Sequence, residues 1–438
     1  MPNNLIINQK IRNFDKKIEV DGDKSLSIRW ILLSSLASAK STAQNLLLSE
    51  DVMAAINTIR KLGIKVIIKD KTCAVYGRGL EGYRYKKNLT LNAQNSGTLG
   101  RLILGLLINT PHPIKLIGDK SLSKRDFKRI TDPLTRFGAI FKLTNNKNLP
   151  LRVLGSKKLK PIYYEEKKGS AQCKSAVIFG GLRTDGSTLI KAKKSRNHTE
   201  LFLNHLKLPI KTIRKKNYDL ISVNKMKKIN FINYKIPSDI SSSAFFIVLT
   251  ALSEKSKLII KNVNTNPSRT GIITILKKMG VKINLKNKKT YKGEENSDIH
   301  VTSSKNLNSI NCPVKLNSGA IDEFLIIFLV AARAKGVSYF KDLGELNQKE
   351  SPRLEWGARI LKEIGIKTIV TKNSIKIFGN PNIKVNKKII IKNYLKDHRV
   401  FMTSVIAALT FGGHWKIYDK NSIKTSFPNF LKILNNLK

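Results

Sequence analysis

The chain has 438 residues, 41% of them hydrophobic, and 81 Lys and Arg against 30 Asp and Glu give a formal net charge of +51. This length predicts two domains with large cores, and the longest apolar run, residues 324–332, is too short to span a membrane. The three cysteines form no CxxC pair, which excludes a disulfide framework or zinc site. The start of the chain has no signal-peptide core, and we expect a cytoplasmic protein.

A net charge of +51 makes nucleic acid a partner to consider. The basic residues are spread over the whole chain, often as single lysines on amphipathic segments, which is typical of a general drift in surface composition. An RNA-binding protein would also need an aromatic stacking surface, whereas aromatic residues make up 7% of the chain. We expect an anionic small-molecule substrate and no need for nucleic acid, with a basic RNA-binding protein as an alternative.

The first predicted helix opens at Asp-Gly-Asp-Lys-Ser-Leu-Ser-Ile-Arg, residues 21–29. Ser25 is its expected N-cap, and apolar residues follow at helical spacing. A near copy, Gly-Asp-Lys-Ser-Leu-Ser-Lys-Arg, occupies residues 118–125. A lysine and hydroxyl groups at a helix N-terminus suit an anion, because free N–H groups and the helix dipole point there. The recurrence of such helix starts favours anion binding over ordinary capping.

A unit of about 70 residues recurs six times along the chain: an amphipathic helix, a turn often containing Gly, and a β-branched strand. Each unit also has a helix that is apolar all round, which predicts burial. These helices are expected at residues 25–39, 96–108, 170–182, 238–252, 321–335 and 397–411. We predict an α/β fold of two similar domains, each with three buried helices at its centre. The Lys- and Asn-rich residues 284–308 are expected to be a surface excursion.

Several familiar site motifs are either absent from the chain or lack the structural context that they need. Residues 77–82 match GxGxxG, but the following residues 83–91 are typical of a strand, not of the helix that a dinucleotide site needs. The chain contains no P-loop, no HExxH and no GxSxG. We therefore expect no metal site.

Cations recur beside the predicted helix starts instead. Lys24 precedes the first buried helix, Arg353 follows Ser-Pro, an expected N-cap and N1 pair, and Asp397 is an N-cap type. Carboxylates stand at other helix starts, where Asp322 and its neighbour are expected to face opposite ways. Arginines at helix termini bind phosphate and carboxylate groups, and a nearby carboxylate can transfer a proton. This pattern predicts an enzyme that acts on two polyanionic small molecules.

At these residues the chain resembles the family of 5-enolpyruvylshikimate-3-phosphate (EPSP) synthases, or 3-phosphoshikimate 1-carboxyvinyltransferases. Eleven segments match in family order, at 22–29, 95–101, 118–125, 170–176, 195–200, 239–246, 266–271, 321–323, 349–354, 397–399 and 425–428. The chain departs from the family at Asn347, where Arg is usual, and at Pro352 and Asn197, where Asp is commoner. The resemblance covers nearly the whole chain.

The resemblance implies the enolpyruvyl transferase fold, an inside-out α/β barrel in which each domain has three βαβαββ-type units. It implies one domain of residues 1–22 plus 238–438, a second of residues 23–237, and an active site in the cleft between them. The family transfers the enolpyruvyl group of phosphoenolpyruvate to the 5-hydroxyl of shikimate 3-phosphate and releases phosphate. This is a step of the shikimate pathway, toward chorismate and the aromatic amino acids, and it needs no cofactor. We expect a monomer.

The resemblance also assigns roles to residues. It implies that shikimate 3-phosphate is bound by Lys24, Ser25, Arg29, Ser170, Ala171, Gln172, Ser195, Asp322 and Lys349. It implies that phosphoenolpyruvate is bound by Lys24, Gly97, Arg125, Gln172, Arg353, His398, Arg399 and Lys424. Asp322 is the expected base on the 5-hydroxyl, Glu350 the expected proton donor to C3, and Lys24 a catalytic residue that meets both substrates.

The related enolpyruvyl transferase that acts on UDP-N-acetylglucosamine is a second alternative. That enzyme usually has a reactive cysteine in a mobile loop of its N-terminal half. Here Cys73 lies in a strand-like run and Cys173 in a predicted helix, so neither fits that role.

Overall fold

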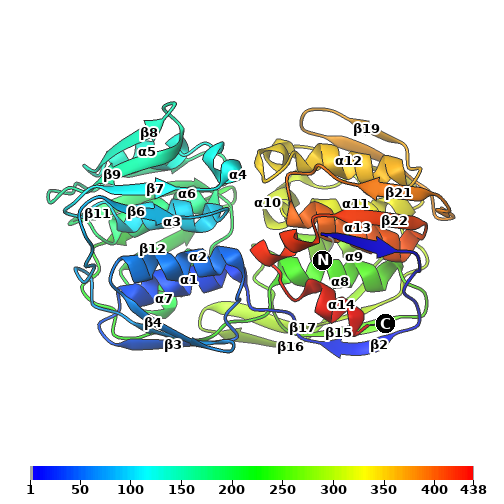
Figure 1. The fold of residues 1–438 in the computed structure, drawn as a ribbon, viewed down its shortest axis with the longest axis horizontal. Helices are drawn as coiled ribbons and strands as arrows, with labels where there is room; N and C mark the ends of the chain where they lie inside the picture. The colour runs from blue at the N-terminus through cyan, green and yellow to red at the C-terminus, as the bar shows by residue number, and fades with distance from the viewer. Residues whose placement is uncertain (1–2, 438) are drawn as a thin grey trace. The chain divides into compact units, whose positions relative to one another are not determined.

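The computed structural model describes residues 3–437 and divides the chain into two compact units (Figure 1). Unit 1 consists of the residues up to Asp21, Pro237–Thr290 and the residues from Glu295 onward. Unit 2 consists of Gly22–Ile236 together with the short segment Tyr291–Glu294. Each unit has its own large hydrophobic core.

Unit 2 contains three repeats of helices and strands. The first has α1 (Lys24–Ser35), β3 (Lys40–Gln44), α2 (Glu50–Lys61), β4 (Lys65–Lys69) and β5 (Thr72–Tyr76), completed by β14 (Asn233–Lys235). The second has β6 (Leu89–Asn92), α3 (Gly97–Leu106), β7 (Ile114–Ile117), α4 (Lys120–Ser123), α5 (Lys128–Thr135), β8 (Ile140–Thr144) and β9 (Asn148–Leu154). The third has β10 (Tyr163–Glu166), α6 (Ala171–Gly181), β11 (Ser187–Lys193), α7 (His198–His205), β12 (Ile210–Arg214) and β13 (Tyr218–Asn224).

Unit 1 repeats the same plan. Its first repeat has β2 (Asp15–Ile18), α8 (Ile240–Leu252), β15 (Lys257–Asn264), α9 (Gly271–Lys278), β16 (Lys282–Tyr291) and β17 (Glu294–Thr302). The second has α10 (Asn317–Ala320), α11 (Phe324–Arg333), β18 (Gly336–Phe340), α12 (Arg353–Glu363), β19 (Thr368–Val370) and β20 (Ile375–Gly379). The third has β21 (Lys388–Ile391), α13 (His398–Phe411), β22 (His414–Tyr418) and α14 (Phe430–Asn435), and β1 (Asn4–Ile7) joins its sheet.

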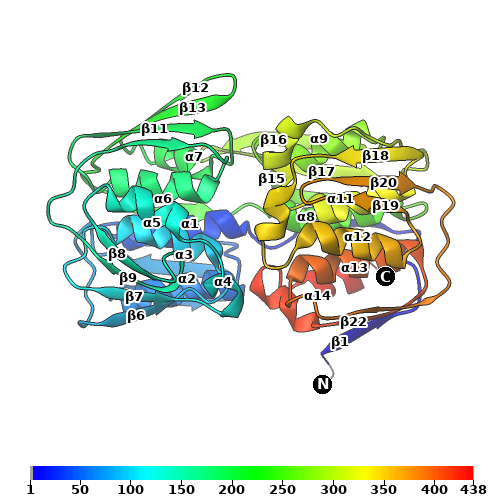
Figure 2. The ribbon, with the colours of Figure 1, turned by 90° about the horizontal axis from the view of Figure 1, so that it is seen from above.

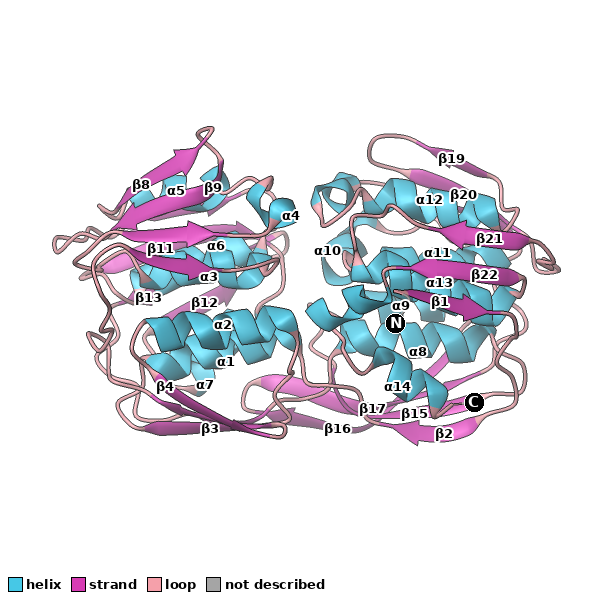
Figure 3. Cartoon of the chain, viewed as in Figure 1, coloured by secondary structure: helices cyan, strands magenta, loops and turns pink. Residues whose placement is uncertain are grey.

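Four of the repeats have a four-stranded sheet with one pattern of strand pairing, whereas the second and third sheets of unit 1, β18-β20-β19 and β1-β22-β21, have three strands. In the second repeat of unit 2, β6 pairs with β7 in parallel, and β7 and β8 both pair with β9 antiparallel. The third repeat, β10 to β13, pairs in the same way. This is the predicted βαβαββ unit, and within each unit the helices lie between the sheets (Figure 3).

All six predicted apolar helices are confirmed as the buried helices α1, α3, α6, α8, α11 and α13. In α8 every residue from Ile240 to Leu252 is buried. A helix that is apolar on every face gains most from burial on every face, and these helices form the middle of each core (Figure 2). Among residues 3–437, no helix is long and apolar enough to cross a membrane.

Three local predictions were wrong, wholly or in part. The N-cap of α1 is Asp23 rather than Ser25, because the Asp23 carboxylate accepts from the Leu26 backbone N–H. Residues 284–308 are a surface excursion only in part, since most of them form β16, which is mostly exposed, and β17, which is largely buried in the sheet. Of the strand expected over residues 83–91, only the end is formed, as part of β6.

Candidate active site

The start of α1 places the predicted lysine beside a carboxylate. Lys24 is the first residue of α1, and its Nζ lies 2.9 Å from Oδ2 of Asp51 in the first turn of α2. The Lys24 side chain is 22% exposed, so its ammonium group remains accessible beside Asp51. Asp51 was not foreseen, because an acidic residue in the first turn of a helix is common without any further partner.

Arg29, one turn further along α1, is buried and held by three helices. Its Nη1 donates to the Ser25 carbonyl at 3.0 Å, Nε to Thr199 Oγ1 at 2.8 Å, and Nη2 to Ser175 Oγ at 3.2 Å. Thr199 and Ser175 belong to α7 and α6. The guanidinium orientation therefore depends on the placement of three separate helices.

A second cluster forms at the starts of α3 and α6. Ser96 caps α3, and a Cβ on the next residue, Gly97, would lie 2.9 Å from Arg101 Nη1 and 3.1 Å from Arg125 Nη1. Arg101 Nη1 donates to Gln172 Oε1 at 2.5 Å, and the Gln172 amide donates to Thr98 Oγ1. The structure thus brings Gly97, Arg125 and Gln172 together, with Arg101 as a member that the sequence did not reveal.

Two serines stand at the starts of α6 and α7. Ser170 caps α6 through Cys173 N and precedes the half-buried Ala171, the first residue of the helix. Its backbone N–H donates to Glu166, whose pKa is raised by burial although backbone N–H groups partly offset this. Ser195 is 9% exposed, and its hydroxyl has no hydrogen-bond partner among the described residues. A buried hydroxyl without a partner is costly, so Ser195 is suited to a ligand.

Arg353 is the centre of the site residues in unit 1. It opens α12 and is 2% exposed, and it contacts the carboxylates of Asp397 (2.9 Å), Glu350 and Asp322 (3.5 Å). Burial alone would lower the pKa of Arg353, but the three carboxylates outweigh it and raise the pKa. Arg353 is therefore a permanently charged group in contact with three carboxylates.

The start of α12 differs from the expectation in how it is capped. Pro352, not Ser351, is its N-cap, and the Ser351 hydroxyl donates to Asp397 at 2.9 Å. The Asn347 side-chain oxygen accepts from the Leu354 backbone N–H at 3.1 Å. Asn347, where the family usually has Arg, thus satisfies an N–H at the start of the helix that carries Arg353.

Asp322 and Glu323 do not face opposite ways as expected. Asp322 lies in the turn before α11, 3.2 Å from Lys349 Nζ, and its backbone carbonyl accepts from Arg399 Nη1. Glu323 does not face away from the site residues: it is the N-cap residue of α11, is buried, contacts the Ser241 hydroxyl and lies 3.7 Å from Arg399. Both carboxylates belong to one charged network.

The last predicted residues lie at α13 and after β22. Asp397 caps α13 as expected, through the backbone N–H of Arg399 at 2.9 Å. His398 is buried, and its Nδ1 lies 3.1 Å from Thr425 Oγ1. Lys424 is exposed on the short 3-10 turn Lys420–Thr425. The pairing of Arg353 with Asp397, 44 residues apart, was missed, because sequence spacing does not reveal contacts between helix starts.

The three cysteines are all buried. Burial raises the pKa of Cys73 to about 12 and that of Cys312 to about 11, and it also raises the pKa of Cys173. Reactive cysteines need a stabilised thiolate, so none of the three has the character that the UDP-N-acetylglucosamine alternative requires.

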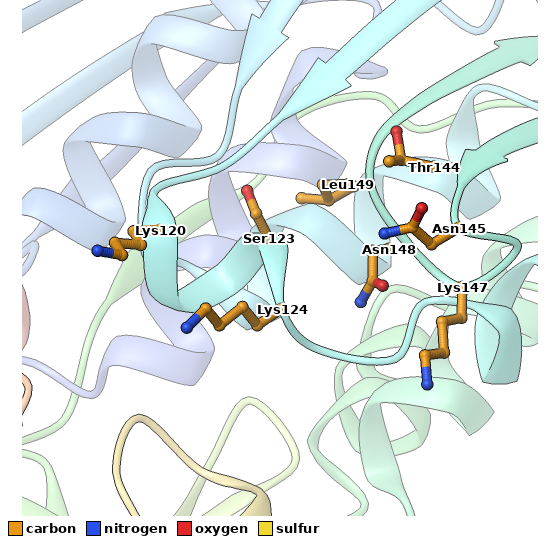
Figure 4. A pocket seen from close by; sticks show the side chains of 8 residues that line it. All are labelled: Lys120, Ser123, Lys124, Thr144, Asn145, Lys147, Asn148 and Leu149. Carbon is orange, nitrogen blue, oxygen red and sulfur yellow. The ribbon is translucent and has the colours of Figure 1, made fainter.

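A hollow of about 380 Å³ lies beside the segment that carries Arg125 (Figure 4). It is lined by Lys120, Ser123, Lys124, Thr144, Asn145, Lys147, Asn148 and Leu149. None of the predicted site residues lines it, although Asn148 donates to the Arg125 backbone carbonyl at 3.2 Å.

Two units of repeated helices and strands, with buried helices between the sheets, give the chain the fold of the enolpyruvyl transferases. The enolpyruvyl transferase NikO from Streptomyces tendae has this fold, with a TM-score of 0.76, 14% identity, and coverage of 100% of this chain and 98% of that one. At that identity the likeness shows the fold alone.

Closer likenesses give the family. The model of EPSP synthase (3-phosphoshikimate 1-carboxyvinyltransferase) matches residues 8–434, and the chain belongs to this family. A 3-phosphoshikimate 1-carboxyvinyltransferase of Caldicellulosiruptor bescii is 39% identical over 425 residues, 97% of this chain and 96% of that protein. One of Ruthia magnifica is 39% identical over 422 residues, 96% of this chain and 94% of that protein. An EPSP synthase structure from Acinetobacter baumannii has a TM-score of 0.86 at 33% identity, covering 99% of this chain and 97% of that one.

Proposed function

We propose that the site residues of unit 1 and unit 2 serve one transfer reaction. As a member of its family, the protein transfers the enolpyruvyl group of phosphoenolpyruvate to the 5-hydroxyl of shikimate 3-phosphate and releases phosphate, in the shikimate pathway. The observation that carries the assignment of residues is the network at Arg353, where one buried cation meets three carboxylates. Such a site can both hold an anion and move a proton.

Shikimate 3-phosphate is assigned mainly to residues of unit 2. Ser170 and Ser195 stand at helix starts, where free N–H groups favour a phosphate, and the unpartnered Ser195 hydroxyl supports this choice. Arg29 is oriented by three helices, as a residue that grips a carboxylate must be. The full set is Lys24, Ser25, Arg29, Ser170, Ala171, Gln172 and Ser195, with Asp322 and Lys349 from unit 1.

Phosphoenolpyruvate is assigned to the clustered arginines. In unit 2 the cluster at Gly97 has two guanidinium groups at the end of a helix, and Lys24 lies at the start of another. The absence of a side chain at Gly97 leaves room beside those groups. The full set is Lys24, Gly97, Arg125 and Gln172 from unit 2, and Arg353, His398, Arg399 and Lys424 from unit 1.

Asp322 and Glu350 are assigned the proton transfers. Lys349 and Arg353 stabilise the charged form of Asp322, which is the form that accepts a proton from the 5-hydroxyl. Glu350 must hold a proton before it can donate one to C3. An anionic substrate that binds Arg353 competes with Glu350 for the guanidinium, and this weakens the hold of Arg353 on the charged form of Glu350. Substrate binding thereby prepares Glu350 as the donor.

Phosphate release tests the function directly. With both substrates the protein should release phosphate, and with either one omitted it should release none. The same assay with UDP-N-acetylglucosamine in place of shikimate 3-phosphate should give no release. Phosphate release with the nucleotide sugar, or from phosphoenolpyruvate alone, would contradict the assignment.

Three further expectations concern the oligomeric state, the location and the partners of the protein. We propose that it acts as a monomer in the cytoplasm and needs no nucleic acid. Sedimentation at several protein concentrations should give one species of 49.3 kDa. Added RNA should leave turnover unchanged at physiological salt, where nonspecific phosphate contacts are screened.

A further inference from the structure

The starts of α6 and α7 are joined by two successive contacts between side chains. Lys174 Nζ lies 2.6 Å from Glu200 Oε1, and Ser175 Oγ lies 2.7 Å from Thr199 Oγ1. Lys174 and Ser175 are neighbours in α6, and Thr199 and Glu200 are neighbours in α7. The two contacts therefore form a double bridge between the N-terminal parts of the two helices.

The double bridge is buried to a degree unusual for charged groups. The side chains of Lys174 and Glu200 are 0% and 4% exposed, and Ser175 and Thr199 are each 1% exposed. A buried ion pair is weak as a source of net stability but strict about geometry, since a displaced partner leaves a buried charge unpaired. Its effect is to fix the spacing of the two helix starts.

The neutral half of the bridge holds Arg29. Thr199 Oγ1 accepts from Arg29 Nε at 2.8 Å, and Ser175 Oγ accepts from Nη2 at 3.2 Å. On the other side of the same turn of α7, His198 Nδ1 lies 2.7 Å from Glu294 Oε1. Three consecutive residues of α7 are thus fixed in place, only three to five positions after Ser195.

We propose that Thr199, Ser175 and the Lys174–Glu200 pair are positioning residues for the shikimate 3-phosphate subsite. This proposal rests on the proposed function, in which Arg29 grips the substrate carboxylate and Ser170 and Ser195 hold the phosphate end. The double bridge sets the distance between the starts of α6 and α7, near these two serines, and orients the guanidinium of Arg29. Neither helix start could shift without moving Arg29.

The test removes the Thr199 hydroxyl without changing the shape of the side chain. Thr199→Val should raise KM for shikimate 3-phosphate about tenfold, because the charged guanidinium of Arg29 loses the hydroxyl that accepts its Nε hydrogen bond. KM for phosphoenolpyruvate should stay within about twofold of the wild-type value, and Thr199→Ser, which restores the hydroxyl, should return KM for shikimate 3-phosphate close to wild type. Calorimetry with shikimate 3-phosphate alone should show the same loss of affinity.

Thr188→Val is the matched control. Thr188 is a fully buried threonine of β11 in the same unit, and its hydroxyl has no partner among the described residues. This variant should leave both KM values unchanged. Should Thr199→Val fail to fold, Ser175→Ala gives the same prediction from the other side of the bridge.

The outcomes separate this proposal from the proposed function. A KM for shikimate 3-phosphate in Thr199→Val equal to that in Thr188→Val would overturn the positioning role, as would equal losses in the Val and Ser variants. A wild-type protein that releases no phosphate with both substrates would instead contradict the function itself.

Replacing the ion pair by Lys174→Met with Glu200→Met removes both charges and avoids an unpaired one, and it should raise KM for shikimate 3-phosphate about threefold in a folded protein.

Discussion

The two units hold the arginines assigned to phosphoenolpyruvate in different ways. In unit 1 Arg353 contacts three carboxylates, and Arg399 lies 3.7 Å from a fourth, Glu323. In unit 2 Arg101 donates to the side-chain amide oxygen of Gln172, and Arg125 donates to that of Asn95. Amide oxygens fix the direction of a guanidinium without changing protonation, whereas carboxylates can take up and release protons.

This difference predicts a division of work. The carboxylate-rich network of unit 1 suits proton transfer, and the amide-held arginines of unit 2 suit the holding of an anion. Changes to the carboxylates of unit 1 should therefore act mainly on turnover, and changes to the substrate-binding arginines of either unit mainly on substrate affinity.

The largest effect is expected from the two carboxylates assigned to proton transfer. Asp322→Asn and Glu350→Gln keep the shape of each side chain and remove its proton chemistry. Each should lower kcat about a hundredfold or more, measured by phosphate release at saturating substrates. The exposed Glu355 in the first turn of α12 is the control, and Glu355→Gln should keep wild-type turnover. If Glu355→Gln lowered kcat as much as the other two variants, the loss would reflect the overall charge around α12. The assignment of proton transfer to Asp322 and Glu350 would then be wrong.

Glu323 cannot serve as that control, although its position beside Asp322 suggested it. Its contacts with Ser241 and Arg399 are buried, so Glu323→Gln would disturb Arg399 as well.

The next effect tests whether cations at helix starts, rather than the bulk charge, hold phosphoenolpyruvate. Arg125→Ala and Arg399→Ala should each raise KM for phosphoenolpyruvate about tenfold, since a charge-assisted contact is worth about 1.5–3 kcal/mol. Lys286→Ala and Lys288→Ala remove the same charge from exposed positions of β16 and should change KM little. Similar shifts in both pairs would show that the +51 net charge attracts the substrate without a defined site.

A smaller effect is expected from Gly97→Ala. The new Cβ would lie 2.9 Å and 3.1 Å from the ends of Arg101 and Arg125, which are flexible and can move aside. KM for phosphoenolpyruvate should rise a few fold, while the free energy of unfolding should hardly fall, because Ala is favoured over Gly within helices by about 1 kcal/mol.

Gly100→Ala in the same helix is the matched control. Its Cβ would meet Ala93 and Phe127 at 3.4 Å, an ordinary contact, and neither arginine. An equal rise in KM for phosphoenolpyruvate in Gly97→Ala and Gly100→Ala would show that the arginines beside Gly97 do not bind this substrate.

Much of the fold could be predicted because its signals are local. Each buried helix is apolar on all faces and each outer helix on one, and the glycine turns at Gly63, Gly138, Gly280 and Gly365 have positive φ as the helix ends require. The β16–β17 hairpin was missed because its Lys and Asn residues are typical of loops, although β17 buries Ile299 and Val301.

The site was predictable only in part, for a different reason. Lys24, Arg353 and Asp397 were found from their places at helix starts. Their partners were not, because the contacts of Lys24 with Asp51 and of Arg353 with Asp397 join helices from different parts of the chain. Only the packing of the helices, within a repeat for Lys24 and between repeats for Arg353, brings those helix starts together.

The smallest effect concerns pH and the buried pair in unit 1. Burial alone would raise the pKa of Asp397, but the charge of Arg353 and its hydrogen bonds outweigh burial and lower the pKa below its ordinary value of 3.8. A carboxyl whose pKa is lower in the folded state adds stability above its unfolded pKa and loses that contribution as the pH falls through the folded value. The free energy of unfolding of the wild type, measured with urea between about pH 5 and 3, should therefore fall more steeply than that of Asp397→Asn.

Arg353 keeps Glu350 and Asp322 as partners in that variant, and the exposed Asp342→Asn should retain the wild-type slope. Parallel curves for the wild type and Asp397→Asn would show that the carboxylates of unit 1 do not depend on Arg353 for their charge, and the contrast between the two units would then lose its electrostatic basis.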